Sequence, residues 1–322
     1  MMRSRQQKTL SIVIPCYRSE LTIREVVEEI LSVTGHLNVM EIILVDDGSP
    51  DHVWDVIEEL VGKYEIVKGI QFARNFGQHS ALMAGYRMAR GDYIVSMDDD
   101  GQSDPVGIEL MLERLEEGYD VVYAKYPVFN KSRFRIFASY INRRMSEIMI
   151  DKPKTIQVNS FNIMRKFVKE EIVRYAYSFP YVGGLVFRAT QNISEVEVNQ
   201  RSRANGQSSY TLLKLFSLWM NGLTVFSAKP LRLSSILGVI CAFLGFLFGF
   251  YTIVRKLIYP DILVGYSSLI ATILFIGGVI MMLLGMMGEY IGRIYVSINC
   301  APQYVIRKVS QNAEEQVSAD EQ

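Results

Sequence analysis

Residues 78–105 read QHSALMAGYRMARGDYIVSMDDDGQSDP, and this stretch decides the fold class. Residues 78–89 have the apolar spacing of a helix, and 92–97 form the short apolar run of a buried strand. Three consecutive aspartates, 98–100, follow that strand directly, and a second helical segment runs over 105–117. The stretch therefore predicts a helix, a strand, an acidic turn and a helix, which is a unit of an α/β protein.

The same alternation extends through the first 125 residues of the chain. Thr22 and Glu25 have the spacing of a capping box, which predicts a helix beginning near Thr22. Ser49 is a good N-cap with Pro50 at the first helical position, which predicts a second helix start. Further strands are expected at 10–15, 40–45, 66–72 and 120–125. Strand–helix alternation of this kind predicts a mostly parallel sheet whose ligands bind beyond the carboxyl ends of the strands.

Composition excludes several classes of protein. The 322 residues contain 34 Lys and Arg against 34 Asp and Glu, a formal net charge of zero. A balanced charge argues against a protein whose main partner is a nucleic acid. Three cysteines and three histidines, all widely spaced, exclude a disulfide scaffold and a cysteine or histidine metal site.

Two long apolar runs near the C-terminus contain no charged residue, at 233–254 and 262–288. Each is long enough for a helix to cross the hydrocarbon core of a bilayer, whereas a pair of buried core helices is the alternative. Glycines such as Gly238, Gly245 and Gly249 favour close packing of the two helices as a hairpin. Basic residues on the flanks favour a cytoplasmic location for the remainder of the chain.

These runs predict a domain organisation. We expect an α/β domain over 1–209, interfacial amphipathic helices over 210–232, the two transmembrane helices at 233–254 and 262–288, and a cytoplasmic tail over 289–322. The apolar, aromatic segment 210–226 suits a helix lying in the membrane interface, with a core helix as the alternative. The basic stretch 131–150 either collects anionic head groups or forms a solvated face.

Carboxylates follow two of the predicted strands, at Asp46–Asp47 and at 98–100. Three adjacent carboxylates repel one another unless a cation lies among them, and a hard divalent ion with oxygen ligands meets that need. The alternative is a solvated acidic turn before the next helix. Residues 47–50 are likewise consistent with a simple turn and helix cap.

The order of motifs resembles the polyprenyl-phosphate glycosyltransferases, which are family 2 enzymes with the GT-A fold. The motifs are IVIPCY, LVDDGS, the stretch from RNFGQHSALMAG to MDDDGQSDP, RANGQSSY, and the ending GEYIGRIY of the second apolar run. The resemblance implies a Rossmann-like GT-A domain, mostly parallel in its sheet, followed by a two-helix transmembrane hairpin. It also implies a bacterial cytoplasmic membrane protein, with the catalytic domain on the cytoplasmic side.

The resemblance further implies roles for individual residues. Asp98 and Asp100 match the D-x-D motif that binds Mg²⁺ or Mn²⁺ with the donor diphosphate, Gln102 matches the glutamine after it and is expected at the same metal site, and the role of Asp99 is left open. The remaining matches are Pro15 and Tyr17 at the floor of the nucleotide pocket, Asp46 and Asp47 near the base and ribose, Arg203 at the donor phosphates, and Lys125, Arg135 and Ser139 at the lipid phosphate.

Two positions depart from the family pattern. The first motif commonly reads P-x-Y-N-E, but here it is Pro15-Cys16-Tyr17-Arg18-Ser19, so that an acidic contact to the nucleotide is absent or comes from Glu20. An aspartate near the reaction centre of many members is Asn159 here. An ionised lipid phosphate is itself the nucleophile and needs no base, so Asn159 is compatible with activity.

The resemblance implies metal-dependent, inverting transfer of one sugar from a nucleoside-diphosphate sugar, with UDP the expected nucleotide, to undecaprenyl phosphate. The product would serve cell-envelope glycan modification. The expected partners are the nucleotide sugar, the polyprenyl phosphate, the bilayer and further copies of the chain, up to a tetramer. The alternatives are an inactive, membrane-tethered nucleotide-sugar-binding protein and a processive polysaccharide synthase; two spans are too few for the channel of the latter.

Overall fold

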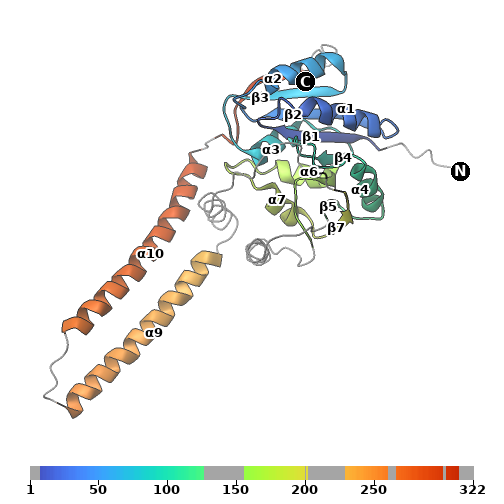
Figure 1. Cartoon of the computed structure of the whole chain (residues 1–322). Helices are drawn as coiled ribbons and strands as arrows, with labels where there is room; N and C mark the ends of the chain where they lie inside the picture. The colour runs from blue at the N-terminus through green and yellow to red at the C-terminus, as the bar shows by residue number, and fades with distance from the viewer. Residues whose placement is uncertain are drawn as a thin grey trace. The chain divides into compact units, whose positions relative to one another are not determined.

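The computed structural model describes residues 8–126, 156–199, 201, 229–259, 266–299 and 302–311 (Figure 1). The chain divides into two compact units. One comprises Met1–Ser209 together with Ala301–Gln322, and the other comprises Tyr210–Cys300. The sheet belongs to the first unit and the two long helices to the second.

The described part of the first unit contains an eight-stranded sheet in the order β7-β5-β6-β4-β1-β2-β3-β8. Parallel pairing joins β1 to β2 and β4, β2 to β3, and β5 to β7, whereas β6 and β8 run antiparallel to their neighbours. The prediction of a mostly parallel α/β sheet is confirmed. The strands are β1 (Leu10–Cys16), β2 (Val39–Asp46), β3 (Val67–Phe72), β4 (Tyr93–Ser96), β5 (Val121–Lys125), β6 (Asn162–Arg165), β7 (Ile193–Glu197) and β8 (Ile306–Ser310).

Helices cover both faces of this sheet (Figure 1). Alternate residues of β1 enter opposite cores: Ile12 and Ile14 pack with one set of helices and Val13 with the other, and all three are fully buried. Because helices cover both faces of the sheet, a ligand cannot bind on either face. The expected binding place is therefore the end of the sheet where the carboxyl ends of the parallel strands meet. The first face carries α1 (Ile23–Val33), α2 (Val53–Lys63) and α4 (Gly107–Glu116), and the second carries α3 (Gln78–Met88), α6 (Lys166–Val173) and α7 (Val182–Ala189).

Both predicted helix caps are wrong in their chemistry. Helix α1 does follow Thr22, but the Thr22 hydroxyl donates to the carbonyl of Asp99 at 2.7 Å and makes no side-chain cap to the helix. Helix α2 begins only at Val53, after His52. Ser49 instead accepts a hydrogen bond from the backbone N–H of Arg18 at 2.8 Å. In each case a contact with a neighbouring loop replaces the local helix cap.

Strand β8 was not expected from the sequence, which predicted only a tail over 289–322. It pairs antiparallel with β3 at the edge of the sheet. The segment before it is also fixed, because the Tyr304 ring stacks on Phe72 with centroids 5.0 Å apart and the backbone N–H of Ala73 donates to Val305 O at 2.9 Å. The chain therefore returns to the first unit after its last long helix.

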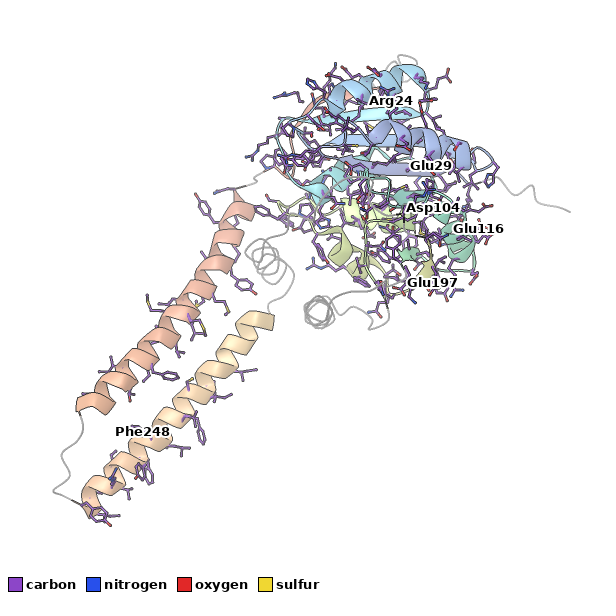
Figure 2. All side chains as sticks on the ribbon, viewed as in Figure 1. Arg24, Glu29, Asp104, Glu116, Glu197 and Phe248 are labelled. Carbon is purple, nitrogen blue, oxygen red and sulfur yellow. The ribbon has the colours of Figure 1, made fainter. Side chains whose placement is uncertain are left out.

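The second unit contains α9 (Lys229–Ile258) and α10 (Tyr266–Ile298). Each contains an apolar stretch of 18 residues. The mean hydropathy is 1.8 for Gly238–Arg255 and 1.6 for Phe275–Gly292, and no described residue of either stretch is buried. By length and composition both helices can cross a membrane. Their apolar side chains stand exposed, as Figure 2 shows for Phe248 on α9.

The glycines of these helices bear on the predicted close packing of the hairpin. A Cβ on Gly238 would lie 4.0 Å from Leu283, so α9 and α10 approach each other there. Among the described atoms, nothing lies within 4 Å of a Cβ placed on Gly245 or Gly249, so their role in close helix packing stays a prediction. The segment 210–228, most of the predicted interfacial region, lies outside the described residues.

We predict that Gly85→Ala destabilises the first unit by about 1–3 kcal/mol, since inserting a methyl group into a packed core forces side chains and backbone to shift. A Cβ at Gly85 on α3 would lie 2.3 Å from a methyl of Val13 on β1. The matched control is Gly62→Ala on α2, where a Cβ meets nothing within 4 Å and helix propensity favours alanine. The midpoint of thermal unfolding in detergent checks this; equal midpoints for the two variants would contradict it.

Candidate active site

A cavity of about 720 Å³ opens in the first unit at the carboxyl edge of the sheet. Its volume is within the range of small-molecule sites. The loops that follow β1, β2, β3 and β4 form its walls, so four parallel strands deliver their carboxyl ends to one place. It is lined by residues 15–22, by Asp47, Asp51, Asn75, Gly77 and Gln78, by Asp98, Asp99 and Asp100, and by Ser160.

Asp98 and Asp100 line the cavity directly after β4 and are partly exposed. One carboxylate oxygen of Asp98 accepts from Gln78 Nε2 at 2.9 Å, and the other accepts from the Ser160 hydroxyl. Asp100 accepts from the backbone N–H of Gln102 at 3.1 Å. These bonds orient both carboxylates on the cavity wall, and a carboxylate can accept about four hydrogen bonds or ligand contacts in all.

Asp99 has a different role, which the sequence left open. Its carboxylate accepts from the backbone N–H of Tyr17 at 2.9 Å, and its carbonyl accepts from the Thr22 hydroxyl. Burial raises the pKa of Asp99 to about 6. Asp99 therefore connects the acidic turn to the loop after β1.

Asp46 and Asp47 are 1% and 3% exposed, and backbone N–H groups hold both of them. Asp46 accepts from the N–H of Ser49 at 2.8 Å, and Asp47 accepts from the N–H groups of Phe76 and Gly77 at 2.7 and 2.9 Å. Burial raises the pKa of both carboxyls, that of Asp47 to about 6. Asp47 lines the cavity; Asp46 is not among the residues that line it.

The loop after β1 forms one wall of the cavity. Pro15 and Tyr17 both line it, as the resemblance implied, and Tyr17 is 43% exposed. Arg18 adopts a positive φ of 59°, which a non-glycine residue rarely adopts, and its guanidinium lies 5.5 Å from the centre of the Tyr17 ring. Glu20 also lines the cavity, where its carboxylate accepts from the backbone N–H of His52 at 2.8 Å. The loop thus places an aromatic ring, a cation and a carboxylate on one wall.

The donor set at the acidic turn suits a magnesium-type site that is completed by substrate. Among the described residues, no group of three histidine, cysteine, aspartate or glutamate side chains is placed to hold a metal ion. The chain would therefore contribute Asp98 and Asp100, with water and phosphate oxygens as the other ligands. Mg²⁺ is commonly bound in this way, by one or two carboxylates and the phosphates of a nucleotide.

Asn159, Lys125 and Gln102 are described by the structure but are not among the residues that line the cavity. The Asn159 amide donates to Ala124 O, while its Oδ1 is buried without a hydrogen-bond partner in the structure as described. Lys125, at the end of β5, pairs with Glu197 at 3.5 Å. Gln102 O accepts from the backbone N–H of Arg201 at 3.0 Å.

Arg201 is the last described residue before Arg203, which the sequence assigned to the donor phosphates. Its guanidinium contacts Glu29 on α1 at 2.6 Å and Asp104 before α4 at 3.2 Å, two residues that Figure 2 labels. Arg203, Arg135 and Ser139 themselves lie outside the described residues. Their proposed roles remain predictions.

Sequence reasoning missed Gln78 and Ser160, whose side chains both donate to Asp98. Gln78 is the first residue of α3, after the positive-φ residue Gly77 (92°). A helix that follows a parallel strand begins at the carboxyl ends of the strands, so the sequence could have predicted that Gln78 lies near the binding site. Ser160 is next to Asn159 in an irregular segment and carried none.

We predict that Asp47→Ala lowers the free energy of unfolding by about 1–3 kcal/mol, because it leaves the N–H groups of Phe76 and Gly77 without their acceptor. The matched control is Asp55→Ala, whose side chain on α2 is 68% exposed and pairs only with His52 among the described contacts. That change should stay within about 0.5 kcal/mol. Thermal unfolding of the two variants side by side checks the difference, and an unchanged midpoint for Asp47→Ala would show that the loop does not depend on this carboxylate.

Comparison with known proteins shows which family the chain resembles. The profile of glycosyl transferase family 2 matches residues 11–173, and that of the GtrB C-terminal hairpin matches 229–294. The glycosyltransferase YkcC of Bacillus subtilis, itself uncharacterised, is 35% identical over 92% of this chain and 93% of its own. The undecaprenyl-phosphate 4-deoxy-4-formamido-L-arabinose transferase of Proteus mirabilis is 34% identical over 93% of each chain.

Among solved structures, glucosyl-3-phosphoglycerate synthase from Mycobacterium tuberculosis, crystallised with Mn²⁺ and UDP-glucose, is similar at 19% identity. The match has a TM-score of 0.49 and covers 68% of this chain and 76% of that one. The assignment rests instead on the sequence profiles and on relatives that match nearly the whole chain. With its mostly parallel sheet of the GT-A type and its C-terminal pair of apolar helices, this chain belongs to glycosyl transferase family 2 and is a glycosyltransferase.

Proposed function

We propose that the chain transfers one sugar from a nucleoside-diphosphate sugar, with UDP the expected nucleotide, to undecaprenyl phosphate at the cytoplasmic face of a bacterial membrane. The reaction inverts the anomeric carbon: an oxygen of the lipid phosphate forms the new bond from one side while the nucleoside diphosphate leaves from the other. The observation that carries the proposal is the placement of Asp98 and Asp100 on a nucleotide-sized cavity in a family 2 fold.

The main chemical difficulty is negative charge. The donor diphosphate and the lipid phosphate repel each other, and the cavity adds carboxylates of its own, among them Asp98 and Asp100 of the D-x-D motif. A divalent cation bound there, Mg²⁺ or Mn²⁺, would neutralise the departing diphosphate. The chain's own part is to fix the two carboxylates through Gln78, Ser160 and the backbone of Gln102.

No residue needs to act as a general base. A phosphate monoester has a second pKa near 6, so the acceptor is largely dianionic at neutral pH and already nucleophilic. This agrees with an amide at Asn159, where many relatives of the family have a carboxylate. Asn159 donates to Ala124 O, and its role is to hold the loop before β6 beside Ser160.

The remaining donor and acceptor contacts follow the family pattern. Arg203 is assigned to the donor phosphates, which is supported by the bond from Arg201 to Gln102 O two residues earlier. Lys125, Arg135 and Ser139 are assigned to the lipid phosphate, and Pro15 and Tyr17 to the nucleotide. The transferases that share about a third of their residues with this chain make 4-deoxy-4-formamido-L-arabinose the first donor sugar to test.

The hairpin suits this acceptor. A polyprenyl tail stays in the bilayer because each buried methylene group contributes about 0.8 kcal/mol. Helices α9 and α10 are both long and apolar enough to cross, and an even number of crossings returns the chain to the side from which it left. Strand β8 pairs in the sheet of the first unit, so both flanks of the hairpin belong to one side of the membrane. A homo-oligomer, up to a tetramer, is part of the proposal.

We predict that Asp98→Asn and Asp100→Asn each abolish most turnover and weaken metal-dependent donor binding, because each removes one of the two anionic ligands of the cation. The matched control is Glu109→Gln on α4, an exposed carboxylate that contacts His36 and does not line the cavity. Initial rates of sugar transfer and donor affinity are measured for all three. Normal rates in either aspartate variant would remove the ion site from this turn.

The proposed reaction is tested with membranes containing the full chain, labelled nucleotide sugars and undecaprenyl phosphate, with and without a chelator. Chelator-sensitive label in one organic-extractable product that carries a single sugar, identified by mass spectrometry, is expected. Nucleotide-sugar binding without transfer would indicate an inactive binding protein. Products of increasing length would indicate a processive synthase.

A further inference from the structure

Two large aromatic side chains stand exposed in the loop between α6 and α7. Tyr177 is 59% exposed and Phe179 is 58% exposed. Phe179 has a φ of 59°, in the left-handed region that bulky residues rarely adopt, and Pro180 follows it. The chain therefore keeps the Phe179 ring at the surface in a strained backbone conformation. We call residues 175–181, with these two exposed rings, the aromatic loop.

The aromatic loop lies at the same edge of the sheet as the cavity. Its last residue, Tyr181, packs edge-on against His79, with ring centroids 5.1 Å apart. His79 is the second residue of α3 and directly follows Gln78, which holds Asp98 in the cavity. The loop is therefore near the acidic turn, on the face of the sheet that α3, α6 and α7 cover.

The aromatic loop is also fastened to the segment that follows α10. Gln303, 7% exposed, donates from Nε2 to the carbonyls of Tyr177 at 2.9 Å and Tyr175 at 3.4 Å. Arg87 joins the same contact, because its guanidinium donates to the Tyr304 hydroxyl at 2.7 Å and to Tyr175 O at 3.4 Å. The chain after α10 and the aromatic loop thus form one hydrogen-bonded group.

Chain length links this group to the proposed membrane helix. Helix α10 ends at Ile298, and Gln303 is four positions after Asn299, the residue that follows the helix. Four residues reach at most about 14 Å when fully extended. Gln303 is bonded to the aromatic loop, so only a short stretch of chain connects that loop to a helix that can cross a bilayer. Tyr and other aromatic rings with one apolar and one polar part concentrate at membrane interfaces.

We propose that Tyr177 and Phe179 insert into the head-group region of the membrane, so that the aromatic loop is the lipid-facing rim of the active site and the polyprenyl acceptor enters beside it. This inference rests on the proposed function, which places the chain at a membrane. It adds which surface of the first unit contacts the lipid. Lipid is the partner that suits this loop, because the loop combines exposed aromatic rings with a short covalent connection to an apolar helix.

The test uses tryptophan reporters in the full chain, reconstituted in vesicles with lipids brominated near the head group. Phe179→Trp and Tyr177→Trp are made separately in a Trp54→Phe, Trp219→Phe background, which removes both native tryptophans. The matched control is Phe167→Trp, an exposed phenylalanine (45%) at the start of α6, where Lys166 N–H donates to Asp92 O at the opposite edge of the sheet. Each protein is also assayed for retention after alkaline washing and for lipid-linked sugar.

We expect brominated lipid to quench both loop reporters strongly and Phe167→Trp little. Protein that is retained and active, but whose loop reporters are quenched no more than Phe167→Trp, would overturn the inference and leave the proposed function standing. Protein that washes off the vesicles and forms no lipid-linked sugar would overturn the proposed function and the inference with it.

Discussion

A carboxylate that is buried at the end of a strand needs hydrogen-bond donors, and that requirement organises the carboxyl edge of this sheet. Asp47 and Asp99 accept from backbone N–H groups of neighbouring loops, and Asp46 accepts from the N–H of Ser49 in its own loop. Those bonds fix the loops after β1, β2 and β3 around a single cavity. Asp98 and Asp100, on the same acidic turn, are held at its wall. The first set of carboxylates holds the loops together, and Asp98 and Asp100 are the pair proposed to bind the cation.

The return of the chain after the hairpin gives the fold a second constraint. Strand β8 closes the β3 edge of the sheet, with Tyr304 stacked on Phe72 and Lys308 paired with Glu58 on α2. The second unit is therefore an insertion between two parts of one domain. A catalytic domain joined to the helices at both ends is restrained more than one on a single linker, because closing the chain on itself removes conformational freedom. That restraint suits an enzyme whose acceptor is proposed to remain in the bilayer.

The α/β class and the transmembrane-length helices could be predicted because both depend on hydrophobic periodicity and length, which are local properties of the sequence. The different roles of the adjacent aspartates could not be predicted, because they depend on distant partners: Asp98 meets the side chains of Gln78 and Ser160, whereas Asp99 meets the backbone N–H of Tyr17. The caps at Thr22 and Ser49 failed for the same reason, since contacts between loops replaced the local bonds. Strand β8 is short and exposed, with little periodicity to distinguish it from a tail.

The central claim is that Asp98 and Asp100 bind a cation together with the donor diphosphate. Calorimetric titration of the purified full chain with UDP, in the presence and absence of Mn²⁺, tests it most directly. The account predicts tight binding of UDP with the ion, weak binding without it, and weak binding of the ion alone, since two carboxylates are too few to hold it. Equally tight binding of UDP in a metal-free buffer would contradict the account.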